Sequence, residues 1–364
     1  MPGTEHAPNT QAPYAPPAGT GVRLGIMDHI DADGRATAEQ YEDRLRLTEL
    51  YDRLDYRAYH LAEHHGTPLG VAPSPNVFLS AVAQRTERLR IGTFVTTLPL
   101  YHPVRLLEEI AMLDHLSGGR LEVGLGRGIS PVEVGYYGID HDETRARFAE
   151  YVELLLRGLT EPELDFHGEF YTVEKVPMVV PPLQRPTPPL WYGIADPKRA
   201  RWAAERGLNI AALLAAPAVR PITDAFRREW DALGRPAGEL PLTAITRNMV
   251  VAPTREEAMR IAERAFVPWR ANIDHTWVKA GLTSPFEART GRSFAEWHGK
   301  GGAFAGTPAE ALAYLRDQTG EAGVTYVAVD PAFGDMTYDE AAQTARLLAE
   351  EVAPTLAESP PGRS

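Results

Sequence analysis

Three ionisable residues stand side by side in the stretch YHLAEHHGTPLG: Glu63, His64 and His65. A neutral imidazole can accept and return a proton near neutral pH, because the unperturbed pKa of histidine is about 6.5. The triplet follows a short apolar run, so it ends a strand and either enters solvent or delivers chemistry to a pocket. If it faces a pocket, these residue types predict proton transfer.

Metal binding is the other chemistry that neighbouring histidines suggest. By strand alternation His64 shares a face with His60 and Ala62, whereas Glu63 and His65 point the other way. Adjacent histidines on opposite faces are poor joint ligands, and the sequence has neither HExxH nor a closely spaced HxH motif. The absence of cysteine also removes thiolate nucleophiles, disulfides, iron–sulfur clusters and zinc ribbons. No metal site is therefore predicted.

The elements that position the triplet follow from the apolar pattern. Short apolar runs alternate with amphipathic stretches, and a helix is expected after each strand; the helix after residues 208–214 is expected near Ala225 to Leu233. The expected strands are residues 22–27, 56–63, 88–98, 119–126, 189–194, 208–214, 242–252 and 324–329. Repeated strand–helix units predict a parallel α/β sheet, and eight favour a TIM-type (β/α)8 barrel with insertions over an open doubly wound sheet. The triplet then lies at the barrel face that carries active sites.

Two long connections interrupt the alternation. The first, about residues 160–189, contains DFHGEFYTVEK, whose alternation around a glycine predicts a β-hairpin. The second, about residues 267–306, follows a helix expected over residues 256–266. Its aromatic residues show little periodicity; they are Trp269, Trp277, Phe286, Phe294, Trp297 and Phe304. Because long ordered loops are commonly functional, this connection is expected to form a lid over the barrel mouth.

Composition excludes several classes of function. The formal net charge is −12, with 37 Lys and Arg against 49 Asp and Glu, which disfavours a nucleic-acid partner. No apolar run approaches the roughly 20 residues of a membrane helix and no signal-peptide pattern is present, so a cytoplasmic protein without a membrane partner is expected. Residues 1–20 are expected to be a disordered proline-rich tail, residues 21–356 one barrel domain, and residues 357–364 a flexible tail.

The segment RIGTFVTTLPLYHPVRLLEEIAMLDHLSGGRLEVGLGRG, residues 90–128, resembles the bacterial luciferase-like flavin-dependent monooxygenases, in register with the EHH triplet. The similarity runs from about Val22 to Leu356 and is densest between Tyr59 and Arg145. Late in the chain it includes GTPAEAL and FGDMTYDEAAQTARLLAEEVAPTL. Each piece alone is weak, but their order and spacing are specific. The resemblance implies a TIM-type barrel that binds reduced flavin at its C-terminal face.

The resemblance also implies a reaction. The expected enzyme uses reduced FMN and O2 to oxygenate a small, largely apolar organic substrate through a flavin C4a-peroxide. A separate NAD(P)H:flavin reductase would supply reduced FMN, since the chain has no dinucleotide fingerprint, and a homodimer is expected. Two alternatives stay open: a deazaflavin (F420)-dependent dehydrogenase on the same fold, and a flavin-binding protein without turnover, which the intact triplet disfavours.

Roles in the triplet follow from the same resemblance. His64 matches the histidine implicated in catalysis in the family, and Glu63 and His65 become supporting residues. For His65, packing behind the strand is an equally good interpretation. His29, in LGIMDHID at the end of the first strand, would also face the pocket of a barrel. It could touch substrate or be a satisfied polar residue at the rim.

Cofactor contacts are expected on the third and fourth units. Arg127 and Arg145 match arginines that face the flavin phosphate, which a planar guanidinium suits; a surface salt bridge on its own helix is the alternative for Arg145. Gly126 lies in GLGRG, whose GxGxG spacing favours close flavin or backbone approach over a dinucleotide loop. The luciferase catalytic subunit has cysteine there, so light emission is not implied. Phe94 and Val95 match a stretch that can carry a cis peptide against the flavin.

The fifth strand departs from the family pattern. After PLWYG the family usually has small hydroxyl residues that hold phosphate at a helix N-terminus, whereas this chain has IADPKRARW. Asp196 is expected to cap the next helix, with Pro197 at its first position, but a carboxylate there would repel phosphate. Lys198 and Arg199 could compensate, or the cofactor could be held in another way. The choice between FMN and F420 therefore depends on this site.

Overall fold

The computed structural model describes residues 21–358, so the expected tails at residues 1–20 and 359–364 lie outside the described chain. Eight strands form a closed ring of parallel pairs. They are β1 (Arg23–Asp28), β2 (Ala58–Leu61), β3 (Arg90–Thr93), β5 (Leu121–Gly126), β8 (Leu190–Gly193), β9 (Asn209–Ala212), β10 (Thr243–Val251) and β12 (Tyr326–Asp330). The ring confirms the TIM-type (β/α)8 barrel predicted from the sequence.

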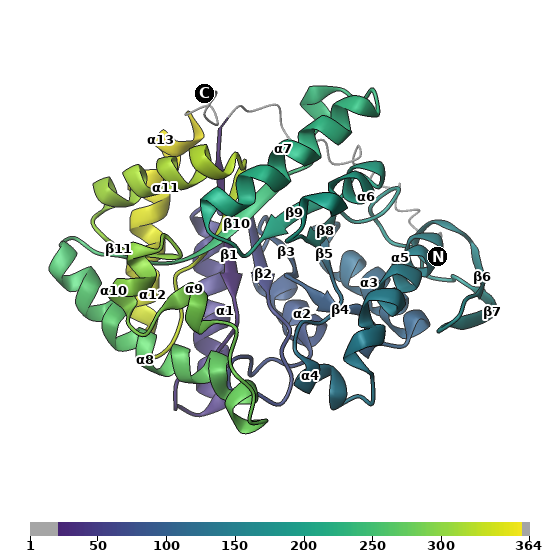
Figure 1. Cartoon of the computed structure of the whole chain (residues 1–364), viewed down its shortest axis with the longest axis horizontal. Coiled ribbons are helices and arrows are strands. Elements are labelled where there is room, and N and C mark those ends of the chain that lie inside the picture. The colour runs from purple at the N-terminus through teal and green to yellow at the C-terminus, as the bar shows by residue number, and fades with distance from the viewer. Residues whose placement is uncertain (1–20, 359–364) are drawn as a thin grey trace, which may run out of the picture.

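Helices surround this ring (Figure 1). The main helix after each strand is α1 (Thr37–Arg53), α2 (Pro75–Arg85), α3 (Pro103–Leu116), α5 (Thr144–Thr160), α6 (Ala200–Glu205), α7 (Ala216–Ala232), α8 (Arg255–Lys279) and α12 (Tyr338–Leu347). Except for α8, their apolar stripes pack against the strands in one large hydrophobic cluster, which fixes the strand ends. No helix within residues 21–358 is long and apolar enough to cross a membrane.

Smaller elements complete the chain. They are β4 (Thr96–Thr97), α4 (Pro131–Gly135), β6 (Glu163–His167), β7 (Thr172–Pro177), α9 (Glu287–Thr290), α10 (Phe294–Gly299), β11 (Ala303–Gly306), α11 (Pro308–Ala322) and α13 (Ala353–Ala357). β6 and β7 pair antiparallel, which confirms the predicted hairpin. α4 lies between β5 and α5, so it belongs to the barrel face that carries the strand ends.

Aromatic side chains fill the barrel interior. The Phe94, Trp191 and Tyr326 side chains pack in one buried cluster, and the ring of His60 stacks on Phe94 with 4.5 Å between ring centroids. Burial lowers the pKa of His60 to about 4, so its imidazole is neutral. Trp191 Nε1 donates to Glu122 Oε2 at 2.7 Å, which satisfies its buried N–H. This layer lies on the barrel axis beneath the strand ends.

Two helices are longer than the sequence pattern indicated. α7 begins at Ala216, nine residues before the predicted start at Ala225, and α8 continues to Lys279 instead of ending near Phe266. Each contains a proline, which conceals a helical pattern because proline normally ends a helix. In α8 the buried Trp269, Ile273 and Thr276 continue the helical spacing, so tertiary burial outweighs the local proline signal.

The second long connection is therefore largely helical. Trp269 and Trp297 stack with 4.2 Å between ring centroids, and Phe294 joins them in a separate hydrophobic cluster. These rings stabilise the connection itself. Trp277 and Phe286 differ, because they line the large cavity at the barrel mouth. The lid expected over residues 267–306 thus divides into a packed base and a shorter segment facing the cavity.

Candidate active site

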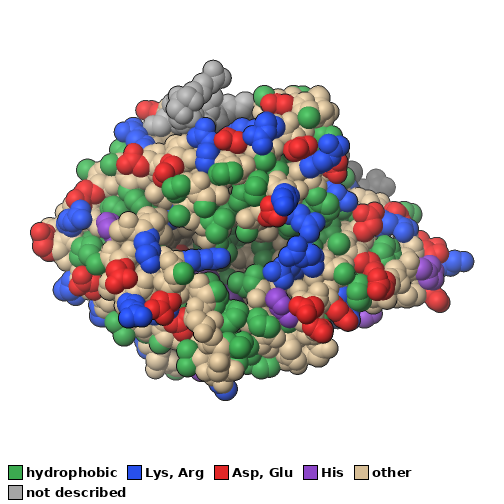
Figure 2. All heavy atoms as spheres, in the orientation of Figure 1, with side chains coloured by type: hydrophobic (Ala, Val, Ile, Leu, Met, Phe, Trp, Pro, Cys, Tyr) green, Lys and Arg blue, Asp and Glu red, His purple; other side chains and the backbone are tan. Residues whose placement is uncertain are grey.

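A cavity of about 630 Å³ lies at the C-terminal ends of the strands, a volume typical of small-molecule sites. In Figure 2 the surface is hollowed near the centre of this view, with Lys and Arg side chains on both sides. The predicted site residues that line the cavity are His29, Glu63, His64, Phe94, Val95, Gly126, Arg127, Arg145, Asp196 and Arg199. His65 and Lys198 are not among its lining residues. The fold therefore brings together residues from most of the chain.

His64 lies between a carboxylate and a second imidazole. Its Nδ1 is 3.3 Å from an oxygen of Glu133, and its ring stacks on that of His29 with 5.6 Å between centroids. Burial raises the pKa of Glu133, but the hydrogen bonds from His64 and from the His65 backbone amide outweigh burial, and the net pKa is lowered. An ionised Glu133 would accept from Nδ1–H and leave Nε2 of His64 as the proton acceptor.

The side chain of His65 supports the site from behind. Its Nε2 is 2.8 Å from Glu63 Oε1, and its Nδ1 is 2.8 Å from the hydroxyl of Tyr137. The other oxygen of Glu63 accepts from the Thr97 backbone amide at 3.1 Å. His65 therefore packs behind the strand end, as one of its two interpretations expected. Its hydrogen bond to Glu63 orients that carboxylate. The triplet lies beyond the end of β2 at Leu61, where the chain is no longer an extended strand. The alternation of side chains along a strand therefore does not determine which way these three residues point.

One wall of the cavity consists of tightly approaching backbone. The Phe94–Val95 peptide bond is cis, at the stretch that the family resemblance singled out. A Cβ at Gly126 would lie 2.2 Å from Cγ2 of Val95, which is closer than atoms can approach. Gly126 is therefore required by the side chain of Val95, and the two segments form one continuous wall.

Arginine side chains gather at one end of the cavity. Arg127 donates to Gly128 O at 3.3 Å and to Thr144 Oγ1 at 3.2 Å, and within residues 21–358 it has no carboxylate partner. Burial lowers the pKa of Arg127, and the positive charge of Arg145 lowers it further. Burial raises the pKa of Tyr192, while Arg199, Arg127 and Arg145 oppose that rise, so all three guanidinium groups act on one ring. An anion would relieve their repulsion.

The predicted alternative for Arg145 was a salt bridge with a glutamate on its own helix. Those glutamates are engaged elsewhere. Glu143 pairs with Arg147 at 2.9 Å, and the carboxylate of Glu150 accepts from the backbone amides of residues 169–171 in the hairpin. Arg145 instead lines the cavity. This arrangement fits the phosphate role that the resemblance implied.

The fifth strand meets the same end of the cavity. Asp196 Oδ1 accepts from the Lys198 backbone amide at 2.9 Å, which confirms the predicted cap, with Pro197 at the first position. Asp196 and Arg199 both line the cavity, so the guanidinium of Arg199 can offset the carboxylate that would repel a phosphate. Lys198 is exposed and does not share this role. The residues present thus fit a phosphate through arginines in place of hydroxyl groups.

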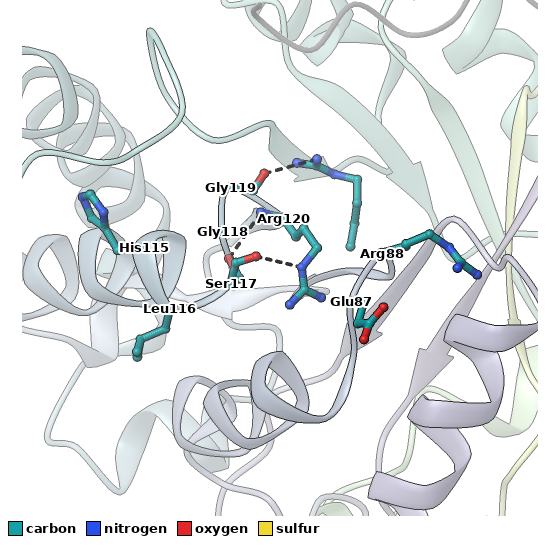
Figure 3. A pocket seen from close by; sticks show the side chains of 9 residues that line it. Glu87, Arg88, His115, Leu116, Ser117, Gly118, Gly119 and Arg120 are labelled. Atoms are coloured by element: carbon teal, nitrogen blue, oxygen red, sulfur yellow. Dashed lines mark hydrogen bonds between the residues drawn. The ribbon is translucent and has the colours of Figure 1, made fainter. Parts of the chain in front are cut away.

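A second pocket of about 540 Å³ lies at the opposite end of the barrel, near the N-terminal ends of β3 and β5. Figure 3 shows Arg120 turned toward Ser117 there. Its guanidinium donates to several backbone carbonyls, including those of Ala83 and Leu89. Arg90 of the same pocket pairs with the buried Glu122 at 2.6 Å. These arginines hold loops together at the barrel end that carries stability rather than chemistry.

Sequence reasoning missed Glu133, Tyr137 and Asp330. A signal existed for Glu133, since Ser130 and Pro131 before it form the start pattern of a helix. In the structure Ser130 Oγ accepts from the Glu133 amide at 3.2 Å, and α4 places the carboxylate over the triplet. Neither Tyr137 nor Asp330 stands in a motif, and each meets its partner only through the fold.

Comparison with known proteins agrees with this geometry. The family model described as luciferase-like monooxygenase matches residues 22–326. The uncharacterized protein y4wF of Sinorhizobium fredii is 42% identical over 337 residues, covering 91% of this chain and 96% of the relative. The oxygenase component of flavin-dependent trigonelline monooxygenase from Acinetobacter baylyi is 29% identical over 193 residues, covering 52% of this chain and 53% of the relative. The crystal structure of monooxygenase RslO1 from Streptomyces bottropensis superposes with a TM-score of 0.81 and 29% identity, covering 92% and 99%.

Proposed function

Because the chain belongs to the luciferase-like monooxygenase family, we propose that it is the oxygenase component of a two-component flavin-dependent monooxygenase. It uses reduced FMN and O2 to oxygenate a small organic substrate. The observation that carries this proposal is one cavity that joins a histidine–carboxylate pair to a group of arginines, for which residues 21–358 supply no carboxylate partner. The first can handle a proton, and the second can hold a phosphate.

The residues present fit reduced FMN. Arg127, Arg145 and Arg199 would hold the phosphate, and the wall formed by Val95 and Gly126 would contact the ring system. When bound, reduced FMN supplies two electrons and the reaction with O2. The protein orients the cofactor, excludes water and moves a proton through Nε2 of His64.

The remaining walls indicate the substrate class. Met27, Ile129, Leu214, Trp277 and Phe286 supply apolar surface to the cavity. Such a lining favours a small, largely apolar substrate and limits the water that would divert reduced oxygen to hydrogen peroxide. Trp277 and Phe286 come from the second long connection, so closing of this segment would complete the enclosure.

We also propose a homodimer and a separate reductase as partners. Val77 of α2 is 69% exposed, and Met112 and Leu116 of α3 are 57% and 50% exposed. α2 and α3 pack side by side, so these side chains can contribute to one apolar surface. Light scattering of the purified protein gives the mass, and Met112→Glu should shift it toward the monomer. A monomeric parent would contradict the homodimer without affecting the proposed reaction.

An anaerobic titration followed by air tests the function. Reduced FMN should bind, and on exposure to air the complex should consume O2 while releasing hydrogen peroxide more slowly than free reduced FMN does. Reduced F420 is titrated in parallel. Tight binding of F420 without consumption of O2 would favour the dehydrogenase, and binding of neither cofactor would overturn the proposed function.

A further inference from the structure

His29 forms a second histidine–carboxylate pair in the cavity wall. Its Nδ1 is 3.6 Å from Oδ2 of Asp330, and the two side chains are 18% and 4% exposed. Nδ1 is itself buried and has no hydrogen-bond partner among the described residues. The side chain of His29 lines the cavity. Of its two ring nitrogens, only Nδ1 is buried without a hydrogen-bond partner within residues 21–358. Asp330 therefore faces the buried side of the ring.

The carboxylate of Asp330 is held in a fixed position. Its Oδ2 accepts from Nδ2 of Asn248 at 2.9 Å, and its Oδ1 accepts from the Ala332 backbone amide at 3.2 Å. Asp330 is the last residue of β12, next to β1 in the barrel. A buried carboxylate held by two donors keeps a fixed orientation, so it can act on the ring of His29.

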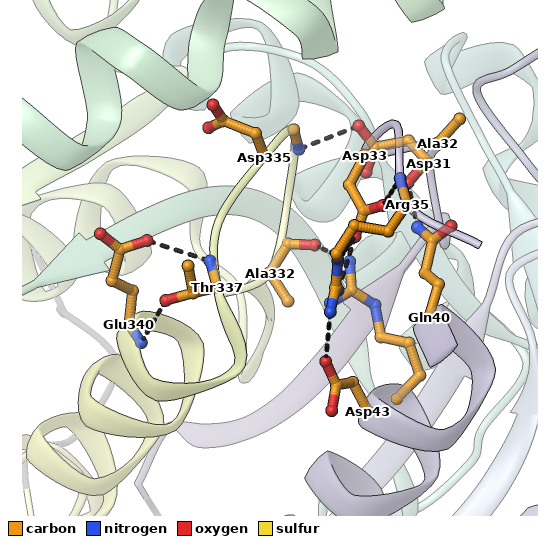
Figure 4. Close-up of polar contacts among 12 residues, drawn as sticks. Asp31, Ala32, Asp33, Arg35, Gln40, Asp43, Ala332, Asp335, Thr337 and Glu340 are labelled. Atoms are coloured by element: carbon orange, nitrogen blue, oxygen red, sulfur yellow. Dashed lines mark hydrogen bonds and ion pairs between the residues drawn. The ribbon is translucent and has the colours of Figure 1, made fainter. Parts of the chain in front are cut away.

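Two more buried carboxylates lie in the same region. Asp28 pairs with Nε of Arg44 at 3.2 Å, and Asp31 accepts from the Gly334 backbone amide at 2.9 Å. Figure 4 shows Asp31 and Gln40 beside Ala332, where the loops that follow β1 and β12 meet. Asp28 and Asp31 both act on the guanidinium of Arg44, and Asp330 adds a third carboxylate to the cluster. Charge in this cluster is balanced either by a proton on a carboxylate or by a second cation.

The imidazole of His29 is the group that can supply this charge. Burial lowers its pKa, but Asp330, Asp31 and Asp28 together outweigh burial, so the net pKa is raised. The groups that face His29 are these three aspartates, Arg44 behind Asp28, and the stacked ring of His64. His64 has its own carboxylate, Glu133. Each of the two stacked histidines therefore has a carboxylate of its own.

We propose that Asp330 holds His29 as an imidazolium whose Nε2–H donates a proton to oxygen in the cavity, while His64 serves as the proton acceptor. This inference rests on the proposed function. In the net reaction reduced FMN and solvent supply two electrons and two protons, one oxygen atom enters the product, and the other leaves as water. His29 gives one proton to the departing oxygen and regains it from solvent. His29 is then a catalytic residue and Asp330 a positioning residue.

The first test uses the protein without cofactor. NMR titration of ¹⁵N-labelled histidines, with His29 assigned through His29→Gln, should give His29 a pKa above 6.5, and Asp330→Asn should lower it by about one pH unit or more. Asp335→Asn is the matched control, because that carboxylate belongs to the same loop but pairs with Arg264. A parent pKa at or below 6.5 overturns the inference, whether or not Asp330→Asn folds.

The second test uses the enzyme with reduced FMN. The rate of oxygenation, measured as O2 consumed but not released as hydrogen peroxide, should fall as pH rises through the pKa of His29, and Asp330→Asn should move this decline to lower pH. His29→Gln should reduce the rate about tenfold or more while FMN still binds. An unchanged rate and pH profile in His29→Gln overturns the inference but leaves the proposed function standing. A raised His29 pKa in a protein that never binds reduced FMN would overturn the proposed function instead.

Discussion

The position of His64 depends on a residue outside its own motif. Its neighbours in sequence, Glu63 and His65, bond to each other and to the chain behind the site. Glu133, from α4, is the carboxylate that reaches the ring nitrogen. We therefore expect His64 to act on a bound molecule, and Glu63 and His65 to support the backbone around it.

His64→Ala should leave binding of reduced FMN nearly intact and lower product formation by about 10²-fold or more, the usual scale for a positioned acid or base. Single-turnover assays with prereduced FMN measure product and hydrogen peroxide together. Glu133→Gln should give a smaller loss, because the ring remains but its orientation relaxes. His65→Ala is the control and should cost less than either. A parental rate in His64→Ala would return the triplet to a solvated strand end.

Replacing both Arg127 and Arg145 with Ala should weaken FMN binding far more than riboflavin binding. Each guanidinium contributes a charge-assisted hydrogen bond of about 1.5–3 kcal/mol only where a phosphate is present. Fluorescence titration with the two flavins measures the difference. Arg147→Ala is the matched control on the same helix, since Arg147 pairs with Glu143 outside the cavity. Equal losses for both flavins would contradict the phosphate assignment.

At the scale of elements, the second long connection combines a fixed base with an exposed tip. Arg270 of α8 pairs with Asp274 and donates to Thr290 Oγ1 and, at 2.7 Å, to Gly291 O. These bonds anchor α9 to α8. The tip around Phe286 faces the cavity with fewer buried contacts, and such segments are the ones that open locally.

Residues 267–306 should be cleaved first in the protein without cofactor and protected when flavin and substrate are bound. Within this range we expect the change at the tip, residues 280–291, because α8 and the aromatic cluster are packed. Limited proteolysis with mass spectrometry locates the cuts. Arg270→Ala should accelerate cleavage, whereas Arg292→Ala, which breaks an exposed pair with Glu287, should not. Protection that does not change with ligand would argue against a lid.

At the scale of the whole molecule, the barrel closes over buried charge. β1 and β12 meet at the cluster of Asp28, Asp31 and Asp330, with Arg44 as its fixed cation. Burial raises the pKa of Asp31 to about 7, and Asp330 adds to this rise while Arg44 opposes it. The cluster therefore holds protons that the unfolded chain would release, and global stability depends on pH.

The sign of that dependence follows from the raised pKa of Asp31. Between its unfolded value of 3.8 and its folded value of about 7, the folded state binds one more proton than the unfolded state. Stability should therefore fall as pH rises through this window, by at most about 1.4 kcal/mol per pH unit for one proton. The raised pKa of His29 acts in the same direction at higher pH.

Asp31→Asn should flatten this dependence and improve stability at pH 8 relative to pH 5, because the amide never carries the buried charge. Urea unfolding at several pH values measures the free energy of unfolding in parent and variant. Asp335→Asn, a half-buried control in the loop after β12 that pairs with Arg264, should leave the slope unchanged. Parallel curves for the parent and Asp31→Asn would show that Asp31 is already ionised at low pH.

The sequence by itself determined the eight strand–helix units, the strand-end position of the EHH triplet, the hairpin and the cap at Asp196. These features depend on local periodicity, turn chemistry and spacing, which a linear chain displays directly. The order of motifs also identified the family. Even the helix that carries Glu133 was signalled locally, by Ser130 and Pro131.

Only the tertiary structure decided which side chains meet. Closure of the barrel pairs His64 with Glu133 and His29 with Asp330. It also places Arg145 in the cavity, while Glu143 pairs with Arg147. The extension of α8 through a proline likewise depends on burial of Trp269 against distant residues. At these points long-range packing outweighs local preference. Burial of a large apolar side chain stabilises the fold by more than the unfavourable propensity of a single residue destabilises it.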